Sequence, residues 1–150
     1  MIYTLDTNVI VDALRRPEEM HLLKEFLDWA LPQTALSSVV ASELLAGART
    51  DSTRRLVDRE LLGAFERRGR IVAPSISAWS KTGHLLGRSG TTSIGASWQN
   101  DVLLAHTARE FGWTIVTRDK DFSRIRALVK GLRVEAPYPR RALTGRAALR

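Results

Sequence analysis

The sequence contains no cysteine among its 150 residues, and this absence removes several kinds of chemistry at once. A disulfide framework, a thiolate zinc site and a cysteine nucleophile are all excluded. Apolar runs are short, and none approaches the roughly 20 residues that a membrane-spanning helix needs. The N-terminal residues Met1 to Asp6 lack the basic start of a secretory signal. We therefore expect a single cytoplasmic domain that does not contact a membrane.

Acidic residues are missing from two long stretches. None occurs between Glu66 and Asp101, and after Asp121 only Glu135 is acidic, although arginine and lysine are frequent in both stretches. The net charge is +7. Basic residues segregated in this way are typical of proteins that meet a phosphate backbone, but they also occur on ordinary soluble surfaces.

Short apolar segments alternate with amphipathic ones along the chain. Strands are expected near residues 2–5, 34–36, 70–73, 113–117 and 132–135, with helices in most of the intervening segments. A loop is expected over 87–97, which is rich in Gly, Ser and Thr. This alternation predicts an α/β domain with a central, mostly parallel sheet of four to five short strands flanked by helices.

Two aspartates stand directly after predicted strands. Asp6 follows the strand 2–5, and Asp119 follows the strand 113–117. Parallel strands deliver the residues at their carboxyl ends to one crevice, which is where α/β sheets bind ligands. The alternative for each residue is a simple helix cap, a role for which Asp is well suited.

Two further acids lie on predicted helices. Asp101 shares a helix face with the apolar Leu104, Ala105 and Ala108, although it could also lie at the rim of that face in the first turn. Glu43 lies in the middle of the helix 39–46, where its side chain could either belong to a site or be solvated. A cluster of hard carboxylates without cysteine favours Mg²⁺ or Mn²⁺ over zinc.

Four short segments resemble the motifs of PIN-domain ribonucleases, in particular those of the VapC toxins of bacterial toxin–antitoxin pairs. In order, they are Leu5-Asp6-Thr7-Asn8-Val9-Ile10, Ser42-Glu43-Leu44-Leu45-Ala46-Gly47, Asn100-Asp101-Val102-Leu103-Leu104-Ala105, and Ile115-Val116-Thr117-Arg118-Asp119-Lys120-Asp121-Phe122. Each motif is weak alone, and their occurrence in this order is a strong signal. The resemblance covers residues 2 to about 135. It implies a PIN-like nuclease domain over 1–136, followed by an arginine-rich tail over 137–150.

The resemblance also implies roles for the residues of these motifs. Asp6, Glu43, Asp101 and Asp119 would hold Mg²⁺ or Mn²⁺ and activate a water for phosphodiester cleavage. Thr7, Asn8 and Thr117 would orient the carboxylates. Asp121 competes with Asp119 for the last acidic position, and we favour Asp119, with Asp121 in a supporting place. His106 replaces the small residue usual in the family and could face either the site or the surface.

Partners follow from the resemblance as well. An endoribonuclease of this kind would cut structured RNA, with tRNA the expected target, and would form a homodimer. A small cognate antitoxin would cover its acidic site, and operator DNA would be bound only through that antitoxin. The alternative is a catalytically silent PIN module that binds nucleic acid within a repressor complex. The role of the tail, which is expected to be loosely attached, is left open.

Overall fold

The computed structural model describes residues 1–89 and 95–141. Its strands are β1 (Ile2–Leu5), β2 (Thr34–Ser37), β3 (Ile71–Val72), β4 (Trp113–Val116) and β5 (Arg133–Glu135). Its helices are α1 (Thr7–Arg15), α2 (Pro17–Ala30), the 3₁₀ turn η1 (Leu31–Gln33), α3 (Ser38–Gly47), α4 (Asp51–Arg55), the π-helical η2 (Leu56–Leu62), α5 (Gly63–Glu66), α6 (Ile76–Arg88), α7 (Ala96–Phe111) and α8 (Asp121–Leu128).

All five strands run parallel in one sheet, in the order β3-β2-β1-β4-β5. Thr4 in β1 is paired with Ala35 on one side and Ile115 on the other. The chain fills the sheet from β1 toward β3 and then returns to the opposite side with β4. A topological switch point therefore lies between β1 and β4, where the carboxyl ends of both strands border a crevice.

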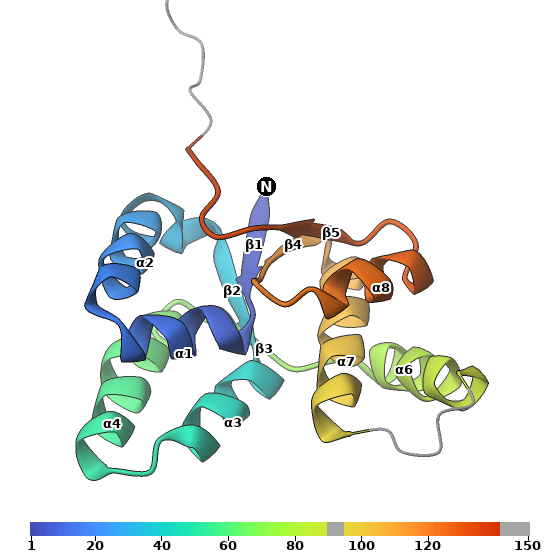
Figure 1. The fold of residues 1–150 in the computed structure, drawn as a ribbon, viewed down its shortest axis with the longest axis horizontal. Coiled ribbons are helices and arrows are strands. Elements are labelled where there is room, and N and C mark those ends of the chain that lie inside the picture. Colours follow the sequence, from blue (N-terminus) through green and yellow to red (C-terminus); the bar gives the residue numbers. More distant parts are fainter. Residues whose placement is uncertain (90–94, 142–150) are drawn as a thin grey trace, which may run out of the picture.

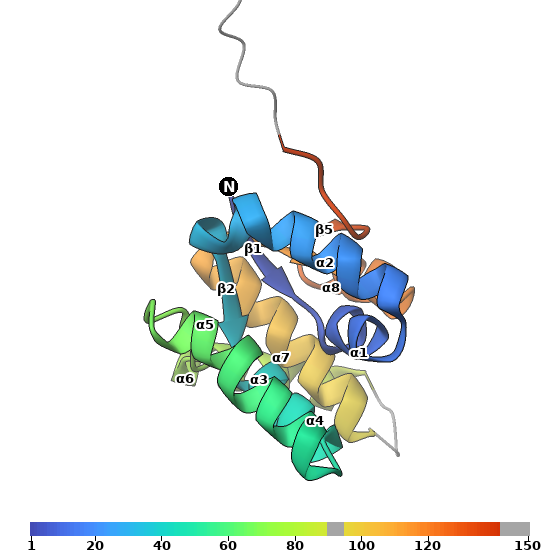
Figure 2. The same ribbon diagram turned by 90° about the vertical axis from the view of Figure 1, so that its left-hand side faces the viewer.

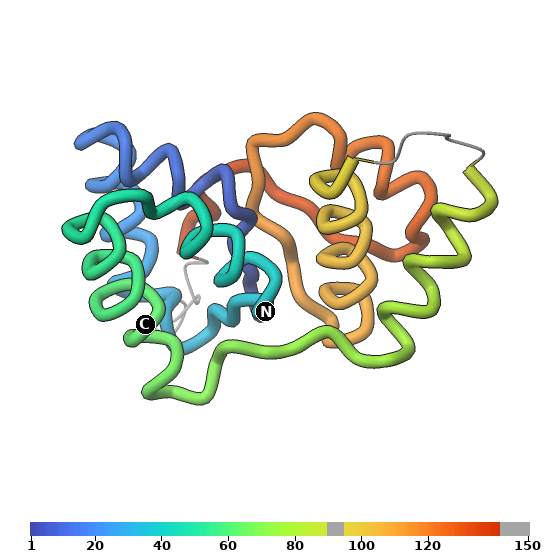
Figure 3. Tube along the Cα trace, turned by 90° about the horizontal axis from the view of Figure 1, so that it is seen from below, coloured from blue at the N-terminus to red at the C-terminus, as the bar shows by residue number. Residues whose placement is uncertain are grey.

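Helices cover the sheet in two groups. Figures 1 and 3 show α1 to α5 on one side of the molecule and α6 to α8 on the other, with the ends of the central strands between them. Figure 2 shows α7 running along the sheet behind β1. Every residue of β2 and β4 is buried, as expected for strands covered on both faces. The largest fully buried side chains include Leu5, Ile10, Leu36, Phe65, Leu103, Leu104, Ile115 and Phe122.

The fold class expected from the sequence is confirmed, but several boundaries differ. The expected loop over 87–97 is too wide, because α6 continues to Arg88 and α7 already begins at Ala96; residues 90–94 lie outside the described part. The helical segment from Asp51 to Glu66 is not one regular α-helix, because it includes the π-helical stretch η2. At the end of α7, Gly112 adopts φ 67°, the left-handed conformation that a terminating glycine provides.

The start of the C-terminal tail is attached to the domain. Tyr138 is partly buried against the core, and its ring centroid lies 5.7 Å from that of Phe26 on α2. The expectation of loose attachment is therefore wrong at this residue, while 142–150 lie outside the described residues. Within the described ranges, no helix is long and apolar enough to cross a membrane.

Candidate active site

Asp6 is the most tightly held carboxylate of the crevice. It follows β1, is 5% exposed and caps α1, because its Oδ1 accepts a hydrogen bond from the Thr7 backbone N–H (2.7 Å). Its Oδ2 accepts from Thr117 Oγ1 (2.7 Å) and from Asn8 Nδ2 (2.6 Å). Asp6 therefore caps α1 and also joins the hydrogen bonds at the strand ends. Its three donors fix the orientation of the carboxylate.

Thr117 joins the ends of β1 and β4. Besides donating to Asp6, its Oγ1 accepts from the backbone N–H of Asp119 (2.9 Å) and from Asn8 Nδ2 (3.1 Å). The Arg118 backbone N–H donates to Asn8 Oδ1 (3.2 Å), so Asn8 also bridges the two strand ends. These contacts determine the path of the loop that carries Asp119.

The structure distinguishes Asp119 from Asp121. Asp119 lies in the loop after β4, where its charge raises the pKa of both Asp6 and Asp101, and its Oδ1 accepts from the Asp121 backbone N–H (2.8 Å). The Asp121 side chain is about half exposed and lies 3.8 Å from Arg124, one turn along α8. This placement favours Asp119 as the residue of the crevice, with Asp121 at its edge.

Glu43 reaches the crevice from α3, whose first turn is capped by Ser37 at the end of β2. Its Oε2 accepts a hydrogen bond from Thr7 Oγ1, and its Oε1 accepts from Asn100 Nδ2 (2.7 Å). Asn100 has no assigned role in the sequence analysis, although it belongs to the Asn100-Asp101 motif. Its position next to Asp101, in the first turns of α7, is the sequence feature that could have identified it as a residue of the site.

Asp101 carries the largest electrostatic perturbation in the group. Burial, and to a smaller extent the neighbouring negative charges, together raise the pKa of Asp101 to about 7; these charges belong to Asp6, Asp119, Glu43 and Asp121. Among the described residues, no group donates a hydrogen bond to Asp101. Burial also raises the pKa of Asp6, against the hydrogen bonds from Thr117 and Thr7 that lower it, and Asp119 and Glu43 contribute to the increase.

The carboxylate oxygens of the crevice are the kind of ligand that binds a hard divalent cation. Carboxylates that raise one another's pKa form a negative site, and a bound cation would offset their repulsion. As they stand, however, no three His, Cys, Asp or Glu side chains in the described ranges are close enough to hold one ion together. The site therefore matches Mg²⁺ or Mn²⁺ in charge and ligand type, and does not contain a closed coordination shell.

A network of ion pairs supports the same loop from outside the crevice. The Arg118 guanidinium pairs with Asp12 on α1 (3.3 Å) and with Glu19 on α2, and Arg16 pairs with both of these acids. The Glu19 side chain is only 11% exposed. No local sequence pattern predicts this network, because Arg118 lies about 100 residues from the two acids with which it pairs.

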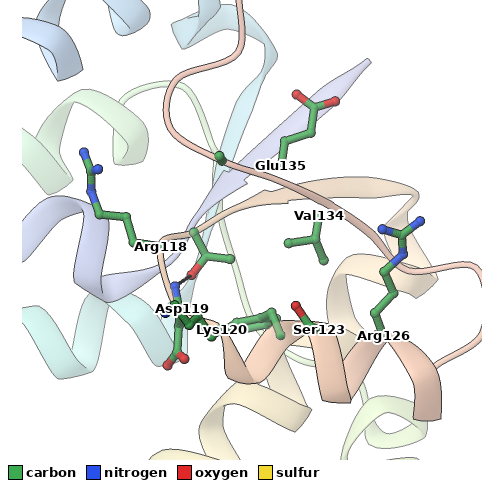
Figure 4. Close-up of a pocket in the computed structure, with 10 residues that line it drawn as sticks. Arg118, Asp119, Lys120, Ser123, Arg126, Val134 and Glu135 are labelled. Atoms are coloured by element: carbon green, nitrogen blue, oxygen red, sulfur yellow. Dashed lines mark hydrogen bonds between the residues drawn. The ribbon is translucent and has the colours of Figure 1, made fainter.

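A groove of about 380 Å³ borders Asp119 on the side of α8 and β5. Figure 4 shows Ser123 and Arg126 on α8 and Lys120 just before this helix. The Asp119 carboxylate points away from Val134. The groove is not the acidic crevice itself. It places basic side chains directly beside the acidic residues.

Comparison with known proteins assigns this arrangement to a family. The model of the PIN domain matches residues 3–128. The chain is 30% identical over 122 residues to the plasmid stability protein StbB of Pseudomonas syringae pv. tomato, covering 77% of this chain and 86% of that protein. Among solved structures, a chain of VapBC2 from Rickettsia felis bound to a promoter DNA fragment has a TM-score of 0.60 at 25% identity, covering 91% of this chain and 98% of that chain. A chain of DNA-bound VapBC from Salmonella typhimurium has a TM-score of 0.66 at 24% identity, covering 91% and 98% respectively.

Proposed function

The chain belongs to the PIN-domain family, whose members are typically nucleases, and we propose that it is a metal-dependent endoribonuclease that acts as the toxin of a toxin–antitoxin pair. One observation carries this proposal: the half-buried Asp101 lies among several other acids, which help to raise its pKa to about 7, and it has no hydrogen-bond donor among the described residues. A carboxylate in that position is suited to a bound cation.

In this proposal the four acids have different tasks. Asp6 and Glu43 are held by hydrogen bonds to both oxygens and provide a fixed negative wall. Asp101 and Asp119 have fewer partners and can turn toward a ligand. When bound, Mg²⁺ or Mn²⁺ would polarise a phosphoryl oxygen and lower the pKa of a water. Thr117 and Asn8 would keep the two strand ends in register while RNA binds.

The substrate class is supported by charge. Lys120 and Arg126 line the groove beside Asp119, so a polyanion that enters the crevice meets cations at its edge. We propose structured RNA as this polyanion, with tRNA as the first candidate.

The proposal is tested by incubating the purified chain with tRNA, other structured RNA and single-stranded DNA, with Mg²⁺ or Mn²⁺ and with EDTA. We expect metal-dependent internal cleavage of RNA that is lost in Asp101→Asn. Asp28→Asn, a substitution of an exposed acid on α2, serves as the control. Retained RNA binding without cleavage under every condition would instead favour the alternative, a catalytically silent PIN module that binds nucleic acid within a repressor complex.

An antitoxin partner is part of the same proposal. The Rickettsia felis structure is a VapBC2 assembly on promoter DNA. In this chain, an apolar groove of about 410 Å³ lies between α1, α2 and η2, with walls that include Leu14, Leu27, Leu56 and Leu61. We propose that an amphipathic segment of a small cognate antitoxin binds there and that operator DNA is reached only through it.

Leu56→Glu should abolish copurification with the product of the adjacent gene and leave RNA cleavage unchanged. Leu128→Glu, which changes another exposed leucine that lies outside the groove, should preserve both.

A homodimer completes the proposal. Ile76 and Trp79, one turn apart on α6, are 86% and 47% exposed, which is unusual for large apolar side chains. We propose that they contact a second copy. Trp79→Glu should then reduce the mass measured by light scattering from that of a dimer to that of a monomer, and an unchanged mass would contradict this assignment.

A further inference from the structure

Beyond the acidic crevice, a second pocket lies between α6 and α7. It has a volume of about 300 Å³ and is lined entirely by basic side chains. Lys81, His84 and Arg88 occupy one face of α6 at positions i, i+3 and i+7, and His106 faces them from α7. Figures 1 and 3 show the two helices side by side.

The side chains of this pocket have no ion-pair partner in the part of the chain that the structure describes. The Nε2 atom of His106 is buried and has no hydrogen-bond partner there. Burial, together with the nearby charge of Lys81, lowers the pKa of His106. The lowered pKa favours the neutral form of His106, so the positive charge of the pocket comes from Lys81 and Arg88, which provide N–H donors and a field suited to an anion.

Another arginine cluster of the chain differs in this respect. Arg54, Arg55 and Arg59 line a surface depression together with Asp51 and Asp58, and Arg54 pairs with Asp51 at 2.9 Å. Its positive charge is partly neutralised within the cluster. The α6–α7 pocket has no such internal neutralisation among its lining residues.

The pocket is distinct from the crevice, although both include residues of α7. His106 follows Asp101 by five residues, which corresponds to a rotation of about 140° and a rise of about 7.5 Å along the helix. Consistent with this, the charges acting on His106 do not include the carboxylates of the crevice. His106 therefore faces the basic pocket and not the acidic site, which settles the alternative that the sequence left open.

We propose that Lys81, His84, Arg88 and His106 form a phosphate-binding subsite for the RNA substrate. This inference rests on the proposed ribonuclease function. RNA whose cleaved phosphate lies at the crevice has further phosphates on both sides, and those that pass α7 reach this pocket. The subsite contributes affinity and holds the substrate in register, while the acids of the crevice perform the chemistry.

The test measures binding separately from cleavage. A labelled RNA hairpin with single-stranded flanks is titrated with the full chain in EDTA, and its Kd is determined by fluorescence anisotropy over a range of salt concentrations. Lys81→Gln combined with Arg88→Gln should weaken binding about tenfold and reduce the slope of log Kd against log salt by about 1.4, because each lost phosphate contact contributes roughly 0.7. His106→Gln should weaken binding by a smaller factor.

The matched control is Arg54→Gln combined with Arg59→Gln, which removes the same net charge from the neutralised cluster and should change Kd little. Equal weakening in both double variants, or none in the pocket variant, would overturn the subsite. A duplex DNA of similar length is titrated in parallel, and an effect confined to DNA would overturn the assignment to RNA. With metal present, the pocket variant should raise KM and leave kcat unchanged.

Failure of the proposed function gives a different result. If the unmodified chain never cleaves RNA but the pocket variant still loses RNA affinity selectively, the ribonuclease assignment is wrong and the phosphate site stands. Circular dichroism of each variant shows whether the fold is retained, and Lys81 and Arg88 are exposed, so their replacement leaves the core untouched.

Discussion

The acidic crevice and the basic pocket lie on different sides of α7, and they are built on opposite principles. In the crevice, like charges are partly buried and are kept in place by neutral donors such as Asn8 and Thr117. In the basic pocket, most of the charged side chains are exposed and lack counter-ions among the described residues. A site for chemistry needs fixed geometry despite repulsion, whereas a site for holding a flexible polyanion needs only an unopposed field.

The strongest test of this contrast is Asp6→Asn. We expect cleavage of RNA to fall by more than about 100-fold, since even an outer partner of a metal ligand is worth up to that factor. RNA affinity in EDTA should stay the same or increase slightly, because a negative charge is removed. The comparison would fail if Asp6→Asn weakened RNA binding as much as the loss of Lys81 and Arg88.

Thr117→Val tests the hydrogen bonds that hold the crevice. The substitution removes the donor to Asp6 and the acceptor for the Asp119 backbone, so we expect cleavage to fall about 10- to 100-fold. Thr114→Val is the matched control within β4, the strand that Thr117 directly follows, because the buried Thr114 hydroxyl has no partner in the described part of the chain. It should leave activity unchanged and stabilise the fold by about 1 kcal/mol, as measured by urea unfolding. Similar activity losses in both variants would point to general damage to β4.

The metal-free protein should lose stability as the pH rises. The pKa of Asp101 is 3.8 in the unfolded reference and about 7 in the fold, so the unfolded state releases its proton first. The contribution of the protonated carboxyl is therefore fully present below pH 4 and disappears as the pH increases through about 7. Asp101→Asn should be more stable than the parent chain at pH 8 in EDTA, with a difference that shrinks toward pH 4. A difference that does not vary with pH would show that the repulsion is absent.

Asn100→Ala should give the smallest effect. It removes the donor to Glu43 Oε1 but leaves the contact of Glu43 with Thr7. We expect a decrease in kcat of up to about tenfold, at the lower end of the range for such supporting contacts, with KM unchanged. A change in KM alone would contradict this role and would indicate that Asn100 contributes to RNA binding.

Much of the crevice follows from local sequence. Asp6 and Asp119 are predictable because each follows a short apolar strand, and the alternation of strands and helices predicts that the carboxyl ends of such strands meet. The end of α7 is equally predictable from Gly112. Glu43 is different, because the sequence of its helix does not show whether its side chain faces the crevice or solvent. Only the resemblance to a family identifies it. Asn100 and the Arg118 network depend on contacts between distant parts of the chain, which no local pattern encodes.

The sequence by itself determined the parallel α/β fold, the family and the acids that meet at the strand ends. These follow from periodicity and from residues that act where the chain places them. Tertiary structure decided how those acids differ: Asp6 is held by donors from α1 and from Thr117 just after β4, while Asp101 has no donor among the described residues. It also decided that His106 faces the basic residues of α6. Hydrogen bonding and mutual repulsion depend on distances across the fold, and only the packing of α3, α7 and the strand ends sets those distances.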